Sequence, residues 1–160
     1  MLSLSKEMYP FEKIVPMYDR YLEELKCFEP SIPFMTNQKI FNMFQDIRLR
    51  NDAHVHLMLD DDQIVGFVII TQAELLYTKA DYCIEEFFVI PERRREGIGL
   101  NIFKQIIKRY QGMGSLYVLK ANLPAQSFWN KVLECNACTV QEETSDLDYA
   151  NLYTYRVEMR

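Results

Sequence analysis

The spacing of hydrophobic residues in the first third of the chain predicts a strand followed by two helices. A short apolar segment at 2–5 suits a strand, and apolar residues then recur every three or four positions at 14–25 and 36–47. Thr36 is a residue type that commonly caps a helix N-terminus, so the second helix is expected to begin there. We expect Pro16 in the first turn of the first helix or at a bend, because an interior proline loses a hydrogen bond.

The middle of the chain changes to the spacing of strands. Residues 54–59 alternate in polarity, Asp60-Asp61-Asp62 is typical of a turn, and 63–71 is rich in Ile, Val and Phe. Together these segments predict a β-hairpin. A further strand is expected at 82–90, and Pro91 ends it.

The last part of the chain alternates between helices and strands. Apolar spacing predicts a helix at 97–110, a strand at 116–121, and a second helix that begins after Asn122. Two final strands fit near Thr139 and at 152–159. The whole order is strand, two helices, three strands, and then helix, strand, helix and two strands, which predicts an α/β domain around a mixed sheet.

Length and composition restrict the class of protein. At 160 residues and without repeats or linkers, the chain is expected to form a single domain, 1–160, that needs no disulfide or metal to fold. Its longest apolar stretch, 64–70, is far shorter than the ~20 residues of a membrane span, and its N-terminus lacks the features of a secretory signal. The net charge of −5 argues against a general nucleic-acid binder and is compatible with a cationic substrate.

The cysteines and histidines give weak signals for metal binding. Four cysteines scattered through a chain that needs no disulfides indicate a reducing cytoplasm. Cys135 and Cys138 have the spacing of a metal or redox pair, but without a second pair or a nearby histidine they are better explained as ordinary half-buried thiols. His54 and His56 would share one face of a strand, and no third ligand accompanies them. We therefore expect no metal site, and we expect both histidines on the polar face.

The segment 82–100 carries the clearest chemical signal. Its strand runs into a basic loop, and Gly97-Ile98-Gly99 then opens a helix. Such a junction directs several unpaired backbone N–H groups and the positive end of the helix dipole to one point, where a phosphate or pyrophosphate fits. Arg94 and Arg95 would add attraction for the phosphate. Taken alone, this pattern also fits a tight turn with no ligand.

Two motifs in this part of the chain resemble those of the GNAT superfamily of acyl-CoA N-acyltransferases. The run Ile84-Glu-Glu-Phe-Phe-Val-Ile-Pro-Glu-Arg-Arg-Arg-Glu-Gly-Ile-Gly99 is similar to motif A of that superfamily, and Asn122-Leu-Pro-Ala-Gln-Ser-Phe-Trp129 is similar to motif B. The Glu-Glu-Phe-Phe-Val run most resembles the diamine and polyamine acetyltransferases. The resemblance implies a GNAT fold, in which a mixed sheet of about seven strands is splayed between the fourth and fifth and is packed with about four helices.

The resemblance also implies which residues bind acetyl-CoA, the expected cosubstrate. Backbone groups of Phe87, Phe88 and Val89 would pair with the pantetheine arm, and an N–H near Val89 would stabilise the oxyanion. The side chains expected near the pantetheine and the thioester come from motif B: Asn122, Phe128 and Trp129. The amides expected to cradle the pyrophosphate belong to the loop and the first helical residues: Arg95, Glu96, Gly97, Ile98, Gly99 and Leu100.

The acceptor of the acetyl group is expected to be a primary amine of a small molecule or peptide, attacking directly in a ternary complex. An alkyl amine with a pKa of ~10.4 is protonated at neutral pH, so a nearby carboxylate must hold the ammonium and take its proton. Glu85 matches the position of the base in the polyamine-type relatives. Glu86 is the second candidate, since a bulge in this strand would change the side that each residue faces. The alternative is that both are simply polar residues on an exposed strand face.

Three positions depart from the family pattern. Trp129 stands where the family has the tyrosine that protonates the leaving thiolate, and an indole cannot act as that acid. Water or another group would then supply the proton, or the thiolate would leave unassisted. Arg95 stands where glycine is common, and Glu96 places a negative charge near the expected phosphate. The missing tyrosine motivates an alternative function, a CoA-binding regulatory or interaction module with weak or no catalysis.

The remaining expectations concern partners. Arg93-Arg94-Arg95 is too small a basic patch for nucleic-acid binding by an acidic chain, and no membrane association is expected. Alternating aromatic residues at Tyr153 and Tyr155 would suit a sheet-edge homodimer. The loops at 28–37 and 75–81 would surround the acceptor, and they contain no pattern that identifies it.

Overall fold

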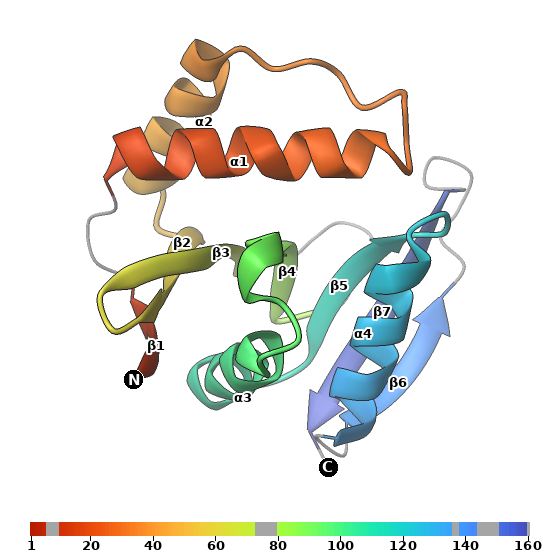
Figure 1. The fold of residues 1–160 in the computed structure, drawn as a ribbon. Coiled ribbons are helices and arrows are strands. Elements are labelled where there is room, and N and C mark those ends of the chain that lie inside the picture. Colours follow the sequence, from red (N-terminus) through yellow and green to blue (C-terminus); the bar gives the residue numbers. More distant parts are fainter. Residues whose placement is uncertain (6–9, 73–79, 136–137, 144–150, 160) are drawn as a thin grey trace.

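The computed structural model describes residues 1–5, 10–72, 80–135, 138–143 and 151–159. Their order of helices and strands is the one predicted from hydrophobic spacing. Figure 1 shows the elements, which in chain order are β1 (Leu2–Ser5), α1 (Phe11–Lys26), α2 (Asn37–Leu49), β2 (Ala53–Asp60), β3 (Gln63–Thr71), β4 (Tyr82–Val89), the 3₁₀ turn η1 (Pro91–Arg93), α3 (Ile98–Arg109), β5 (Gly114–Leu119), α4 (Leu123–Cys135), β6 (Cys138–Glu143) and β7 (Leu152–Met159). Most of the loop expected at 75–81 lies outside the described residues.

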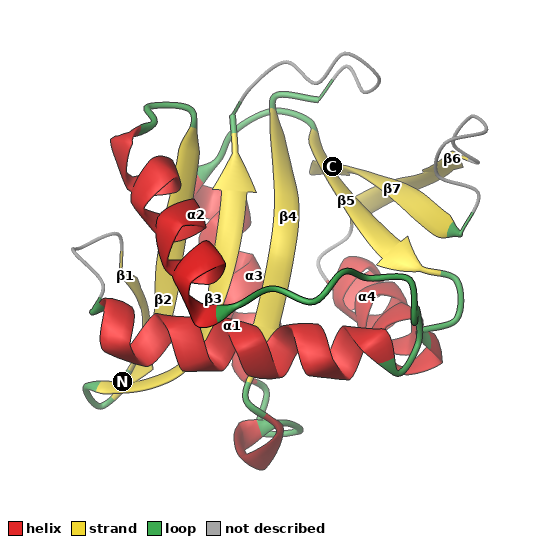
Figure 2. Ribbon diagram, turned by 90° about the horizontal axis from the view of Figure 1, so that it is seen from above, coloured by secondary structure: helices red, strands yellow, loops and turns green. Residues whose placement is uncertain are grey.

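The strands of the described residues form one sheet in the order β1-β2-β3-β4-β5-β7-β6. Neighbouring strands are antiparallel except for β4 and β5, which run parallel. The register of that parallel pair covers only Tyr82–Ile84 against Gly114–Leu116, and the rest of the two strands diverges (Figure 2). The predicted splay between the fourth and fifth strands is therefore confirmed.

Helices cover both faces of the sheet (Figure 1). On one face, α1 and α2 pack against β2, β3 and β4, where Ile14, Phe44 and Phe67 are fully buried. On the other face, α3 and α4 pack through Phe103 and Leu133, among others. Burial of this apolar surface on two sides of one sheet is the main stabilising contribution in such a layered fold. Within the described residues, none of the helices is both long and apolar enough to cross a bilayer.

Pro16 lies in the second turn of α1, not in the first turn. The helix runs from Phe11 to Lys26 with the proline inside it. Figure 1 shows α1 as one continuous helix. Proline removes the N–H that would bond to the carbonyl of Glu12, four residues earlier. Both Glu12 and Pro16 are exposed, so water can hydrate that carbonyl and the loss is tolerated. The predicted cap of α2 is confirmed, because the Thr36 Oγ1 accepts a hydrogen bond from Lys39 N at 3.3 Å.

A bulge in β4 determines how the functional side chains are presented. Ile69 of β3 pairs with Glu86, and the next residue, Ile70, pairs with Ile84. Glu85 is therefore the extra residue on β4. A bulge places two residues of one strand against one residue of its partner and interrupts the strict alternation of side chains. The bulge lies just past the last residue of β4 that pairs with β5.

Candidate functional site

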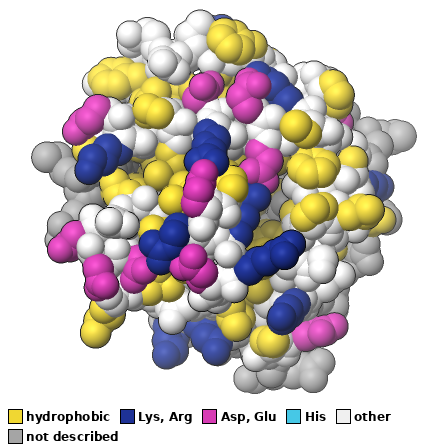
Figure 3. Space-filling model, in the orientation of Figure 1, with side chains coloured by type: hydrophobic (Ala, Val, Ile, Leu, Met, Phe, Trp, Pro, Cys, Tyr) yellow, Lys and Arg dark blue, Asp and Glu magenta, His cyan; other side chains and the backbone are white. Residues whose placement is uncertain are grey.

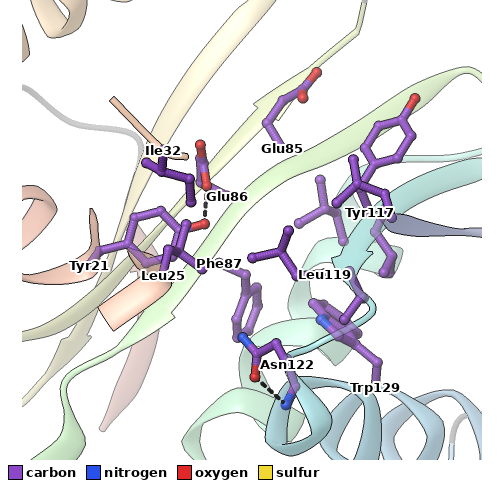
Figure 4. A pocket seen from close by; sticks show the side chains of 15 residues that line it. Tyr21, Leu25, Ile32, Glu85, Glu86, Phe87, Tyr117, Leu119, Asn122 and Trp129 are labelled. Carbon is purple, nitrogen blue, oxygen red and sulfur yellow. Dashed lines mark hydrogen bonds between the residues drawn. The ribbon is translucent and has the colours of Figure 1, made fainter. Parts of the chain in front are cut away.

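A pocket of about 410 Å³ opens where β4 and β5 diverge (Figure 4). Its walls come from β4, β5, the start of β7, the end of α1, the loop that follows α1, and the start of α4. The lining residues are Tyr21, Leu25, Ile32, Ile84, Glu85, Glu86, Phe87, Leu116, Tyr117, Val118, Leu119, Asn122, Ala125, Trp129 and Leu152. Glu85 and Glu86 carry the only formal charges among these residues, so an otherwise uncharged pocket contains two carboxylates and is suited to a cation.

The two glutamates point in different directions from the bulge. Figure 4 shows Glu86 turned toward Tyr21 on α1, while Glu85 extends along the opening on another side. The Glu85 Oε1 accepts a hydrogen bond from the Thr71 hydroxyl at 2.7 Å. The structure therefore brings both predicted candidates for the proton acceptor to one pocket, each with its own hydrogen-bond partner.

Glu86 is held by two tyrosines of α1. The Tyr18 hydroxyl donates to Glu86 Oε1 at 3.3 Å, and the Tyr21 hydroxyl donates to Glu86 Oε2. Burial raises the pKa of Glu86 to about 7, against the lowering effect of the two tyrosine hydrogen bonds, and the charge of Glu85 raises it further. A carboxyl group with a pKa near neutrality is suited to accept and release a proton at physiological pH.

The backbone of β4 leaves polar groups available on the side of the pocket. Ile90 N donates to Val65 O at 3.0 Å, so in the antiparallel ladder the bonded positions of this stretch are Phe88 and Ile90. The intervening residues, Phe87 and Val89, direct their N–H and C=O groups away from β3, toward the gap from which β5 has diverged. The Val89 carbonyl accepts a hydrogen bond from Arg94 Nε, so the groups left available are the N–H and C=O of Phe87 and the N–H of Val89. This geometry suits a polar chain lying along β4 as an extra strand.

Motif B contributes a helix cap and an aromatic wall. Asn122 caps α4, since its Oδ1 accepts from Ala125 N at 3.0 Å, and the amide nitrogen lies on the side of the pocket (Figure 4). Trp129 is buried, and its ring lies 5.1 Å from Phe87 and 5.0 Å from Phe128, measured between centroids. These contacts place the indole in a cluster of aromatic rings at the wall of the pocket.

The N-terminus of α3 has free backbone donors. Gly97 has a positive φ of 79° and precedes the helix without a side-chain cap, and the first helical bond runs from Asn101 N to Gly97 O at 3.0 Å. The amides of 98–100 consequently have no acceptor within the described chain. A Cβ placed on Gly97 would meet nothing within 4 Å, so the space in front of the turn is open. These features suit an anion.

The arginines before α3 are paired with carboxylates. Arg94 makes a bidentate pair with Glu24 at 2.9 and 2.7 Å, and its Nε donates to the Val89 carbonyl at 2.9 Å. Arg93 bridges Asp60 at 2.7 Å and Glu96 at 2.8 Å. Figure 3 shows acidic and basic side chains intermixed on this face of the molecule. Arg94 thus faces α1 in this arrangement, and the charge of Glu96 is compensated.

Arg95 is exposed and has a positive φ of 65°. This is the left-handed conformation that glycine adopts without steric cost, and the position is the one where the resemblance led us to expect glycine. The backbone turn of the loop is therefore formed despite the substitution. The Arg95 side chain is free to extend into solvent.

No cluster of three or more metal-ligating side chains occurs in the described part of the chain. The expectation that both histidines lie on the polar face is wrong for His56. That residue is fully buried, and its Nε2 lies 2.5 Å from the Tyr110 hydroxyl. The sheet is covered by helices on both faces, so this strand has no solvent-facing side at this point. Cys135 is exposed rather than half-buried.

The contribution of α1 to the pocket was not predicted from the sequence. Tyr21, Leu25 and Ile32 line it, and Tyr18 reaches it through Glu86. A signal was present, since tyrosines three residues apart place two hydroxyls on one side of a helix. Their partner is more than sixty residues away in sequence, which hydrophobic spacing does not show.

Known structures share this fold. An acetyltransferase from Thermus thermophilus superposes with a TM-score of 0.71 at 12% identity, covering 97% of this chain and 95% of that chain. A PaiA N-acetyltransferase from Thermoplasma acidophilum, solved with coenzyme A, superposes with a TM-score of 0.63 at 15% identity, covering 100% of this chain and 99% of that chain. A spermidine N-acetyltransferase from Vibrio cholerae, solved with CoA and spermine, superposes with a TM-score of 0.65 at 11% identity, covering 98% of this chain and 93% of that chain. At these identities the similarity concerns the fold.

The sequence matches a family model as well. No curated protein sequence matches the chain significantly. The model of the acetyltransferase (GNAT) family, however, matches residues 15–134, which is most of the chain and includes both motifs. The chain therefore belongs to the GNAT acetyltransferase family and is an acyl-CoA-dependent N-acetyltransferase.

Proposed function

We propose that this protein transfers the acetyl group of acetyl-CoA to a primary amine by direct attack in a ternary complex. The observation that carries the proposal is the pocket at the divergence of β4 and β5, whose lining contains two carboxylates and no basic side chain. It lies between the free backbone edge of β4 and the capped start of α4. A site of this composition can take a protonated amine and remove its proton.

The chain has groups that fit acetyl-CoA. The unpaired amides of 98–100 and the open space before Gly97 suit the pyrophosphate. Backbone groups of Phe87 would pair with the pantetheine arm, with the Asn122 amide nitrogen beside it. When bound, acetyl-CoA supplies the acetyl group as an activated thioester. The Val89 N–H, which faces the gap, would stabilise the charge that develops on the carbonyl oxygen.

We propose a role for Arg94 that differs from the expected phosphate contact. Its guanidinium is occupied by Glu24 and by the Val89 carbonyl, so we propose that it fixes the loop to α1 rather than contacting phosphate. Arg95 and the amides around it remain available to the cosubstrate. Glu96, paired with Arg93, repels the phosphate less than an unpaired carboxylate would.

The acceptor is a cationic amine with an apolar portion. Leu25, Ile32 and Leu152 provide apolar walls, and the two glutamates attract the ammonium. Converting a protonated amine and a thioester into an amide and a thiol releases one proton overall, so the enzyme needs a group that accepts it. Glu85 and Glu86 are the groups in the pocket that can do so. Spermine, present in the Vibrio cholerae structure, belongs to this chemical class.

The leaving thiolate is not assisted by a tyrosine at position 129. The Trp129 indole is enclosed by aromatic rings and carries no acidic proton. Because thiols have pKa values of ~8.5, a thiolate is a tolerable leaving group at neutral pH and can take its proton from water.

A screen of amines tests this proposal. Thiol release from acetyl-CoA is measured with monoamines, diamines, polyamines, aminoglycosides and peptides, and the products are identified by mass spectrometry. We expect a subset of cationic amines to be acetylated, with a lower rate in Glu85→Gln and Glu86→Gln at neutral pH. If no amine raises thiol release above hydrolysis while coenzyme A still binds, the proposal is wrong and a CoA-binding regulatory module is favoured.

A further inference from the structure

Two hydroxyl groups of α1 converge on one carboxylate of β4. Tyr18 donates to one oxygen of Glu86 at 3.3 Å, and Tyr21 donates to the other. Figure 4 shows the Tyr21 hydroxyl and the Glu86 carboxylate meeting at the wall of the pocket. Each oxygen of Glu86 therefore has its own donor, which defines both the position and the orientation of the carboxylate.

The tyrosines cannot easily move away from this arrangement. Tyr18 is 5% exposed, and its ring packs at 5.3 Å on Phe44 and 5.6 Å on Phe67. Tyr21 packs at 5.7 Å on Phe67 and 5.5 Å on Phe88. Because these aromatic contacts belong to the core between α1 and the sheet, they fix the two hydroxyls before any substrate arrives.

The charged and titratable groups around Glu86 are few. From α1 they are Tyr18 and Tyr21, and on β4 they are Glu85 and the buried thiol of Cys83. The residue opposite on β3 is Ile69, and Ile32 from the loop after α1 is apolar. Tyr117 of β5 lines the other side of the pocket. Since no cation lines the described pocket, the tyrosine hydroxyls are the groups that stabilise the ionised form of Glu86 until an ammonium enters.

Glu85 is held differently. It is the bulged residue of β4, and its carboxylate accepts a hydrogen bond from the hydroxyl of Thr71, the last residue of β3. Its carboxylate is directed away from the tyrosine pair (Figure 4). The geometry thus separates the two glutamates, one fixed by rigid donors within the pocket wall and one at the opening.

We infer that Tyr18 and Tyr21 are positioning residues that hold Glu86, rather than Glu85, as the group that receives the proton of the acceptor amine. The inference rests on the proposed function. One proton moves from the ammonium nitrogen to an oxygen of Glu86, and the freed electron pair of nitrogen forms the bond to the acetyl carbon. The C–S bond then breaks, the sulfur leaves as a thiolate, and the second proton lost by the nitrogen passes through water to that thiolate. Glu86 then releases its proton to solvent before the next turnover. Glu85 attracts the ammonium at the opening.

Titration of the carboxyl groups tests the role of the tyrosines without any turnover. In protein labelled with ¹³C at the glutamate carboxyl, we expect one resonance that titrates near neutrality and is absent in Glu86→Gln. Tyr21→Phe keeps the ring and removes one donor to the carboxylate, so the midpoint should rise by about one pH unit. Tyr18→Phe should raise it by less, since its bond is longer. As the matched control, Tyr153→Phe on β7, outside the pocket lining, should leave the midpoint unchanged. An unchanged midpoint in folded Tyr21→Phe overturns the inference.

The pH dependence of kcat/KM tests which glutamate accepts the proton. With an acetylated amine from the screen, the acidic limb of the profile should have the same midpoint as the Glu86 resonance and should shift upward with it in Tyr21→Phe. Glu85→Gln should raise KM for the amine, and the acidic limb should still be present in the pH profile of this variant. A limb that persists in Glu86→Gln and disappears in Glu85→Gln overturns the inference. If no amine is acetylated, the proposed function and the proton transfer fail together, whereas the resonance shift still decides whether the tyrosines control Glu86.

Discussion

Gly99 lies so close to the ring of Phe128 that a side chain at position 99 would have to displace the ring. A Cβ built on Gly99 would come within 2.7 Å of both Cε2 and Cζ of the ring. Gly99 belongs to the first turn of α3, and Phe128 lies on α4. The contact therefore joins the two sequence motifs and sets the spacing between the anion-binding turn and the aromatic wall of the pocket.

Gly99→Ala should consequently weaken both stability and coenzyme A binding. The new methyl group must displace the Phe128 ring or the start of α3, and overpacking of this kind costs ~1–3 kcal/mol. We expect a lower free energy of unfolding in urea and a higher Kd for coenzyme A by calorimetry. Phe128→Leu in the same background should recover part of the loss, with a coupling of ~0.5–3 kcal/mol in the double-mutant cycle. Strictly additive effects would contradict the contact.

Arg95→Gly should stabilise the protein relative to Arg95→Ala. Both substitutions remove the same charge, but only glycine relieves the left-handed backbone conformation at φ 65°. A residue with a Cβ in this conformation costs about 1 kcal/mol relative to glycine, part of which the greater freedom of unfolded glycine cancels. Unfolding in urea measures the difference. A less stable glycine variant would show that the loop does not adopt this conformation.

Substitution of Asn122 separates its structural role from its binding role. Asn122→Ala removes the cap of α4 and should lower the free energy of unfolding by ~1 kcal/mol. Asn122→Asp retains the oxygen that accepts from Ala125 N, so its stability should remain close to that of the wild type. It replaces the amide nitrogen beside the pocket by an oxygen, and coenzyme A should bind it more weakly. Equal binding of coenzyme A by Asn122→Asp and the wild type would exclude a contact through that nitrogen.

Much of the fold could be predicted from the sequence because hydrophobic spacing is a local signal. The repeat of apolar positions can be recognised within a few residues in the hairpin of β2 and β3 and in the amphipathic helices α3 and α4. The bulge at Glu85 could not be found this way, since it depends on the register against β3. His56 illustrates a related limit, because its polarity suggested exposure while the covering of both sheet faces buries it.

The site was only partly predictable for the same reason. The glycines and the two glutamates belong to one contiguous motif, so they could be named as candidates. The tyrosines of α1 have the spacing of core residues, and the carboxylate that accepts from their hydroxyls, Glu86, is distant in sequence. The sequence also suggested a phosphate contact for Arg94, because a basic loop does not reveal that Glu24 on α1 pairs with it.

The stability of the protein should depend on pH through Glu86. Its pKa is raised from 4.5 to about 7 in the folded state, so between these values the folded chain keeps a proton that the unfolded chain has lost. The stabilisation is complete below pH ~4.5 and is lost as the pH rises to ~7, by an amount on the order of 3 kcal/mol. We expect the wild type to lose stability relative to Glu86→Gln across this window in urea unfolding. Parallel pH profiles of the two proteins would contradict the raised pKa.

The placement of coenzyme A is the claim on which the account of the site depends. A crystal structure of the protein with coenzyme A tests it most directly. We predict the pyrophosphate within hydrogen-bond distance of the amides of 98–100, the pantetheine along Phe87–Val89, and the thiol at the pocket that contains Glu86. Coenzyme A bound at another surface, or a chain that binds none at saturating concentration, would contradict the account.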